Sequence, residues 1–342
     1  MTSHELIKRT INHDSPERIG HDFSRKSSDV MWAGGVRLKA AAEGEDQLYQ
    51  WGRHKKLLAE VPDFDGEVFR DVFGNIYGRL DGITKGECIK GVLHEGWEKF
   101  TDYDLPAPDP AVYEEFLAQN LHASEKYVVV GLPVSVFSTL RDMRLMHNAL
   151  MDVLLEPDNV KFFLEKITTT VEKIVPRLAN AGIDAIMIAD DWGVQDRTFI
   201  GVQPFRELFI PAYKKIADTL HDNGMHFILH SCGKILDFVR PLIDAGVDVF
   251  QFDQPEVYGT KFLAEQFGAK ATFYCPVDVQ KVLPTGDKEF IQTKALEMVD
   301  NFRTICGGSL IVKDYPTYGD IGVKEEWADW ARDTVIANSN LL

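Results

Sequence analysis

Short apolar runs alternate with longer amphipathic segments over the last two thirds of the chain, and the runs predict buried strands. The runs begin near residues 127, 185, 227, 247, 271 and 309. A glycine precedes four of them, at Gly182, Gly224, Gly246 and Gly268, where a helix would end in a left-handed cap. Serial units of helix, glycine and strand predict parallel strands joined by helical crossovers.

The first 125 residues have a less regular pattern. A polar arm or short helix is expected over residues 1–17, a strand over 17–23, and charged helical structure over 25–65. A hairpin around Gly74 and Asn75 and a strand over 88–93 follow, then a proline-rich loop before a helix that begins at Pro110.

Together these segments give roughly eight strands, which predicts one (β/α)8 barrel over residues 1–342 with residues 1–65 as a helical N-terminal extension. A tail helix is expected to begin near Val323. An open doubly wound sheet is the alternative, although no glycine-rich phosphate fingerprint follows any strand.

Composition narrows the classes of partner. The chain has 37 basic and 53 acidic side chains, for a net charge of -16, which disfavours nucleic acid and anionic membrane surfaces. No apolar run approaches the roughly 18 residues that span a bilayer, and the start of the chain lacks the pattern of a secretory signal. Four widely spaced cysteines do not form a disulfide framework, so a cytoplasmic, reduced protein is expected.

Candidate metal ligands fall at the C-terminal ends of three predicted strands, where barrels place their chemistry. His230 and Cys232 are two residues apart and so point to the same side of an extended chain. Asp253 and Cys275 end the next two strands. Nitrogen and sulfur donors with one position left open are typical of catalytic zinc, although buried cysteines without a ligand role are common. Cys88 and Cys306, which do not follow strands, are expected to be structural.

Further polar residues are expected at the same rim. Asp190 and Asp191 follow a predicted strand and are candidates for acid or base catalysis, for substrate positioning or for hydrogen bonding to a zinc-bound imidazole; the alternative is loop or helix capping. His94 follows the strand predicted over 88–93 and is a third catalytic candidate, or else a solvated loop residue.

From about residue 65 onward the chain resembles the uroporphyrinogen decarboxylase superfamily. The similar segments are Ile-Ala-Asp-Asp-Trp-Gly at 188–193, His-Ser-Cys-Gly at 230–233, and residues 248–254 and 277–280. The superfamily includes the decarboxylase itself and methyltransferases that depend on cobalamin or zinc. The decarboxylase carries an Arg-Gln-Ala-Gly-Arg motif, whereas residues 31–37 here read Met-Trp-Ala-Gly-Gly-Val-Arg. That difference, with the net charge, argues against a substrate bearing eight carboxylates.

The methyltransferase branch is the one that the resemblance favours. Relatives that methylate a thiol carrier have a further cysteine on the last strand, where this chain has Lys313 and Asp314. With Cys275 one strand earlier, the chain looks more like the zinc-dependent first methyltransferases of anaerobic O-demethylase systems. These move a methyl group from a methoxylated aromatic to the cobalt of a separate corrinoid protein. The resemblance implies zinc on His230, Cys232 and Cys275, acting as a Lewis acid on the ether oxygen.

This reading implies an aromatic substrate pocket and a corrinoid-bearing partner. The residues proposed to hold the substrate ring are Trp97, Trp192, Phe199, Tyr258 and Tyr315. Each of them could instead be a core residue, because aromatic side chains commonly fill cores. Alternatives are a methyltransferase acting on a thiol, methylamine or methanol, a superfamily protein without metal, or a binding protein that stores zinc or handles corrinoid. No corrinoid-binding module is evident in the chain, and a homodimer would be compatible with the fold.

Overall fold

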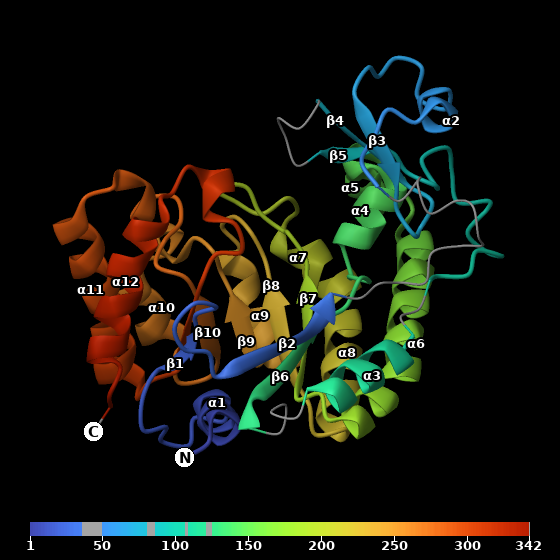
Figure 1. Ribbon diagram of the computed structural model, residues 1–342. Coiled ribbons are helices and arrows are strands. Elements are labelled where there is room, and N and C mark those ends of the chain that lie inside the picture. The colour runs from blue at the N-terminus through green and yellow to red at the C-terminus, as the bar shows by residue number, and fades with distance from the viewer. Residues whose placement is uncertain (36–49, 81–85, 107–108, 121–124, 342) are drawn as a thin grey trace.

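Eight parallel strands form a nearly closed barrel in the computed structural model, which describes residues 1–35, 50–80, 86–106, 109–120 and 125–341 (Figure 1). Around the barrel the order is β1, β2, β6, β7, β8, β9, β10 and β11. Neighbouring strands pair in parallel ladders, but no ladder joins β1 to β2, so the barrel is open at that point. Asp22 bridges that gap, accepting hydrogen bonds from Ser28 Oγ at 2.7 Å and Trp32 Nε1 at 3.1 Å. The predicted (β/α)8 barrel is therefore confirmed. The barrel strands are Gly20–Asp22 (β1), Val30–Gly35 (β2), Tyr127–Gly131 (β6), Ala185–Ala189 (β7), His226–His230 (β8), Val249–Gln251 (β9), Thr272–Cys275 (β10) and Leu310–Lys313 (β11).

Helices cover the outside of the barrel (Figure 1). Gly182 and Gly246 cap α6 and α9 in the left-handed conformation, as predicted, whereas Gly268 has φ of -61° and does not. None of the described helices is long and apolar enough to cross a membrane. The helices are Ser3–Ile11 (α1), Lys55–Leu58 (α2), Ala111–Gln119 (α3), Ser138–Arg144 (α4), Met146–Leu155 (α5), Pro157–Ala181 (α6), Val202–Pro204 (α7), Ile210–Asp222 (α8), Leu236–Ala245 (α9), Thr260–Phe267 (α10), Lys288–Cys306 (α11) and Glu325–Asn338 (α12), with a π-helical turn at Phe205–Phe209 and 3₁₀ turns at Pro255–Val257, Leu283–Thr285 and Tyr318–Ile321.

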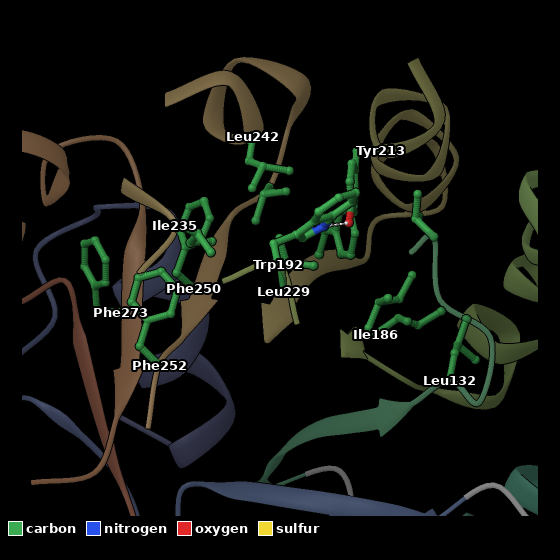
Figure 2. Close-up of a cluster of buried hydrophobic side chains, with 14 of the residues drawn as sticks. Leu132, Ile186, Trp192, Tyr213, Leu229, Ile235, Leu242, Phe250, Phe252 and Phe273 are labelled. Atoms are coloured by element: carbon green, nitrogen blue, oxygen red, sulfur yellow. Dashed lines mark hydrogen bonds between the residues drawn. The ribbon is translucent and has the colours of Figure 1, made fainter. Parts of the chain in front are cut away.

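Alternate residues of each strand belong to two separate cores, because successive side chains point to opposite faces of a sheet. Inward-facing residues of seven strands pack together in the lumen. Outward-facing residues pack against the helices, and Figure 2 shows part of this outer layer, with the Trp192 indole beside the Tyr213 hydroxyl. The lumen set from the strands is Val30, Tyr127, Val129, Ala185, Ile228, Val249, Tyr274 and Ile311.

Helix α1 closes the N-terminal end of the barrel (Figure 1). Ile7 and Ile11 are buried among the lumen residues, and Thr272 Oγ1 on β10 donates a hydrogen bond to the Thr10 carbonyl at 3.0 Å. His4 also contacts Asp184, just before β7, at 2.9 Å. The short helix predicted at the start of the chain thus plugs the bottom of the lumen.

A small antiparallel sheet stands apart from the barrel, near α4 and α5 (Figure 1). Its strands are β3 (Glu67–Arg70), β4 (Ile76–Arg79) and β5 (Glu87–Lys90). The predicted hairpin is confirmed by β3 and β4, and the strand predicted over 88–93 joins this sheet as β5 rather than the barrel. The helical prediction over 25–65 is wrong at β2, where a short apolar run pairs with β6; residues 36–49 of that prediction lie outside the described residues.

Candidate metal centre at the barrel mouth

Asp191, His230 and Cys232 bring three metal-binding atoms within 4.8 Å of one another at the C-terminal ends of β7 and β8. His230 Nε2 lies 3.5 Å from Cys232 Sγ and 3.5 Å from Asp191 Oδ1. Zinc bond lengths in a tetrahedron place two ligand atoms about 3.4 to 3.6 Å apart, so these separations fit one ion. We call the three residues the metal centre. The expectation that His230 and Cys232 share one side is confirmed.

Hydrogen bonds select the imidazole tautomer of His230 that can bind a metal through Nε2. Its Nδ1 contacts Gln251 Oε1, on the neighbouring strand β9. Gln251 Nε2 donates to Asp253 Oδ1 at 2.7 Å, and because only the amide nitrogen can donate to a carboxylate, the amide oxygen must face the imidazole. His230 therefore carries its proton on Nδ1 and presents the Nε2 lone pair to the metal centre.

Asp253 anchors this arrangement by accepting the hydrogen bond from Gln251. Its Oδ1 lies 3.1 Å from Lys313 Nζ on β11, and the two side chains are only 13% and 11% exposed. Burial alone would raise the pKa of Asp253, but Lys313, His230 and the Gln251 amide together lower it below its usual range. The predicted role of Asp253 as a fourth ligand stays a prediction; in this structure its partners are Gln251 and Lys313.

The loop after β8 is shaped so that Cys232 meets Asp191. Cys232 N–H donates to Asp191 Oδ1 at 2.8 Å. Gly233 has φ of 75°, and a Cβ atom there would clash with the Gly193 carbonyl oxygen, so only glycine allows the two loops to pack this closely. Burial, then the Asp191 charge, raises the pKa of Cys232 to about 12. A bound divalent cation would reverse that shift, because a coordinated thiol is deprotonated.

Cys275 lies outside the metal centre. On β10 it alternates with Tyr274, which faces the lumen, and its own side chain is 1% exposed within the outer layer. Burial raises its pKa to about 12. The ligand role predicted for Cys275 stays a prediction, and the described residues put the Asp191 carboxylate beside His230 and Cys232 instead.

The adjacent Asp190 and Asp191 have different surroundings. Asp190 is fully buried and faces outward, where it accepts hydrogen bonds from the N–H groups of residues 136–138 at 2.7 to 2.9 Å and from Tyr213 OH at 2.7 Å. Burial raises the pKa of Asp190, while these donors oppose the shift. Asp191 is 40% exposed at the mouth. Asp190 thus fixes the start of α4, which agrees with the loop or helix capping considered as the alternative role of this residue. The catalytic role of Asp190 stays a prediction.

The predicted substrate-contacting aromatics are dispersed. Trp192 is fully buried, its ring 4.1 Å from that of Phe137 and its Nε1 donating to Tyr213 OH at 2.7 Å (Figure 2). Tyr258 OH donates to the Gly233 carbonyl at 2.7 Å and so supports the loop that carries Cys232. In these interactions, neither the Trp192 ring nor the Tyr258 ring contacts the side chains of the metal centre.

The remaining predicted residues lie on other loops. Trp97 packs under the Arg144 guanidinium, 5.1 Å from its centre, and His94 Nδ1 lies 2.7 Å from the Gly91 carbonyl, while Tyr315 N–H donates to Tyr318 OH at 3.2 Å. Phe199 is partly buried against the outer core. Their proposed roles at the site stay predictions.

Gln251 contacts His230 and Lys313 contacts Asp253, and neither Gln251 nor Lys313 is among the site residues predicted from the sequence. Both face the lumen, one on β9 and one on β11. The available signal was a polar residue within an otherwise apolar strand, Val-Phe-Gln-Phe at 249–252. A buried amide of this kind needs partners, which makes it a candidate for orienting a neighbouring ligand.

Comparison with known proteins agrees with this architecture. Residues 115–308, more than half of the chain, match the family model described as uroporphyrinogen decarboxylase (URO-D). No curated protein matches the sequence. Among solved structures, a methyltransferase from Methanosarcina mazei is similar over 98% of this chain and 99% of its own, with a TM-score of 0.65 and 12% identity. A D-psicose 3-epimerase covers 70% of this chain and 85% of its own, with a TM-score of 0.42 and 14% identity. The resemblance to the superfamily is thereby confirmed, and the chain belongs to the uroporphyrinogen decarboxylase family.

Proposed function

We propose that this protein is a zinc-dependent methyltransferase that moves a methyl group from a methoxylated aromatic compound to the cobalt(I) of a separate corrinoid protein. The observation that carries the proposal is the metal centre, in which three ligand types that suit zinc meet at the mouth of the barrel. The full-length similarity of fold to a methyltransferase supports the same reaction class.

The donor set suits activation of a leaving group. An aryl methyl ether transfers its methyl group slowly because a phenolate must leave, and bound zinc would supply a Lewis acid for that oxygen. One thiolate and one carboxylate balance the charge of a divalent cation, with His230 as the neutral third ligand. A site with more thiolates would be richer in electrons and better suited to activating a bound thiol. The fourth position is left for the substrate, as in other catalytic zinc sites.

The chain's own residues orient the metal centre and set its charge. Gln251 fixes the imidazole of His230, and the ion pair of Asp253 and Lys313 fixes Gln251. Lys313 also brings an ammonium group to the lumen side of the mouth, where it favours the negative charge that develops on the departing oxygen. The Lys313 charge favours the Cys232 thiolate, but burial and the Asp191 charge outweigh it, so the pKa of Cys232 is raised.

Metal analysis of matched variants tests the site. We expect about one zinc per chain in the purified protein, lost in Asp191→Asn and in Cys232→Ala but retained in Cys275→Ala. Loss in Cys275→Ala with retention in Asp191→Asn would restore the ligand set predicted from the sequence. A wild-type protein that takes up no zinc would remove the Lewis-acid mechanism.

The reaction is tested with free cob(I)alamin as methyl acceptor, followed by the absorbance change that accompanies its methylation. We expect methylation from a methoxybenzoate only with zinc-loaded protein, and none in His230→Ala. Methylation from methanol or methylamine in place of the methoxyarene would assign one of the alternative activities.

A further inference from the structure

A cavity of about 550 Å³ lies between the small sheet and the junction of α4 with α5. Tyr77, Glu87 and Cys88 line it from β4 and β5, and Arg141 and Asp142 line it from α4. Figure 1 shows the sheet next to these two helices. The volume is in the range of small-molecule sites and well above that of one bound water.

The cavity adjoins the metal centre through α4. Ser138, the first residue of α4, accepts a hydrogen bond from Asp191 N–H at 3.3 Å. Arg141 lies three residues further, on the same side of the helix and about 5 Å along its axis. Burial would lower the pKa of Arg141, but Asp142 and, at longer range, Asp191 raise it, so the guanidinium lies within electrostatic reach of the metal centre.

Arg141 lines the cavity and has N–H groups available for a ligand. Its Nε donates to Asp142 Oδ1 at 2.8 Å, and no described residue accepts from either of its Nη groups. Each carboxylate oxygen of Asp142 by contrast has a partner, because the second accepts from Tyr77 OH at 2.7 Å; the Asp142 carbonyl accepts from Cys88 Sγ at 3.2 Å. At a residue that lines the cavity, the two Nη groups thus have no acceptor among the described residues, and paired N–H donors of this kind can bind a carboxylate in a bidentate manner.

The helix junction that carries these groups is fixed in place. Leu145, between the two helices, has φ of 65° and ψ of 148°, a conformation that costs free energy for a residue with a side chain. Arg144 beside it forms a buried ion pair with Asp152 and donates to the Leu93 carbonyl. Leu93 N–H in turn donates to the Met143 carbonyl at 2.8 Å. The cavity wall is thus preformed rather than assembled by a ligand.

We propose that this cavity binds the carboxylate of a methoxylated aromatic acid, with both Nη groups of Arg141 donating to its two oxygens. The methyl-donor part of this inference rests on the proposed function; the carboxylate site itself does not. A ring bound in this way would extend from Arg141 toward Ser138 and Asp191, along one turn of α4. A cationic ligand would meet the charge of the Arg141 guanidinium, and both carboxylate oxygens of Asp142 are already hydrogen-bonded, which leaves Glu87 as the lining carboxylate that could receive it.

Binding of three matched probes tests the assignment without any methyl transfer. The probes are 3-methoxybenzoate, its neutral analogue 3-methoxybenzamide and the cationic 3-methoxybenzylammonium, titrated calorimetrically into the zinc-loaded protein. We expect the benzoate to bind at least tenfold more tightly than the amide, and the ammonium probe not to bind. In Arg141→Gln the benzoate should lose that advantage and bind within about twofold of the amide, and Arg141→Lys should keep only part of it.

Arg240→Gln is the matched control, because this arginine is exposed and paired with Asp244 on the outer helix α9. It should leave all three affinities unchanged, and thermal unfolding of each variant shows that a loss of binding is not a loss of fold. Equal affinities for benzoate and amide in the wild type, preferred binding of the ammonium probe, or an Arg141→Gln variant that still prefers the benzoate would overturn the assignment.

The two proposals fail in different ways. If 3-methoxybenzoate binds through Arg141 but no methyl group reaches cob(I)alamin, the carboxylate site stands and the proposed reaction falls. If methyl transfer proceeds at equal rates from benzoate and amide and is indifferent to Arg141, the reaction stands and the carboxylate site falls.

Discussion

At the C-terminal ends of the strands, the side chains that face the lumen differ from those that face the helices. The lumen side carries His230, Gln251 and Lys313, linked to one another by hydrogen bonds through Asp253 and partly open at the mouth. The outer side carries Cys275, a polar residue of the kinds used in catalysis, but wholly enclosed by the outer core. The type of residue at a strand end is therefore a weaker guide to chemistry than the face on which it lies.

Asp190 and Asp191 show this difference between the two faces most clearly, because they are the same residue type at adjacent positions. One fastens the start of α4 from the outer layer, and the other joins the metal centre. If the two faces do have separate tasks, changes on the outer face should cost stability, and changes on the lumen face should cost metal binding.

The largest expected effect is that of Asp190→Ala. It would leave three buried N–H groups and the Tyr213 hydroxyl without their acceptor, so we expect the free energy of unfolding to fall by about 4 kcal/mol. Asp191→Ala, its matched control, should change it by less than about 1 kcal/mol. Urea unfolding with a chelator present, so that bound metal does not contribute, measures both. Equal losses in the two variants would mean that the two faces do not differ as described.

Lys313→Met should destabilise the protein by about 3 kcal/mol at pH 7, because it leaves the Asp253 carboxylate buried without its cation. The pKa of Asp253 is lowered in the folded state, so the stability it contributes is present above its unfolded pKa of about 4 and is lost as the pH falls through the lower folded value. The difference between wild type and variant should accordingly shrink at acidic pH. Unfolding measured from pH 3 to 8 gives this profile.

Lys294→Met is the control for that series, since Lys294 pairs with the half-exposed Glu297 and should have an effect below about 1 kcal/mol. A Lys313→Met deficit that does not vary with pH would show that packing, and not the ion pair, accounts for the loss.

Among these variants, Gln251→Leu should change the free energy of unfolding least, and its main effect should be a lower zinc affinity. Without the amide, His230 loses the acceptor that orients it, and zinc affinity should fall about 10- to 100-fold, or up to about 3 kcal/mol. Competition with a chromophoric chelator measures the affinity, with the exposed Gln203→Leu as a variant that should match wild type. An unchanged zinc affinity would mean that Gln251 supports the strand and not the ligand.

Much of the barrel could be predicted from the sequence, because strands after residue 125 are separated by glycine-capped helices. The pairing of His230 with Cys232 follows from their spacing alone. The face on which Cys275 lies could not be predicted in the same way, because every residue of β10 is buried and the strand shows no polar alternation from which to infer direction. β2 was missed for a related reason: its six residues form one short apolar run within a charged region.

The approach of Asp191 to the metal centre depends on contacts between two loops far apart in the sequence. Gly193 and Gly233 allow those two loops to pack closely. The sequence alone does not show which loop each glycine packs against. The role of Asp190 could be stated only as an alternative, because nothing in two adjacent aspartates says which of them turns outward.

Helix α1 has a kinetic consequence. With Ile7 and Ile11 seated in the bottom of the lumen, the described chain leaves the mouth as the entrance through which reactants reach the metal centre. If the protein acts as proposed, a corrinoid protein docked at the mouth would block the entry of a small methyl donor. Turnover would then follow a compulsory order, in which the donor binds first, the protein acceptor binds second, and the demethylated product leaves only after the acceptor has dissociated.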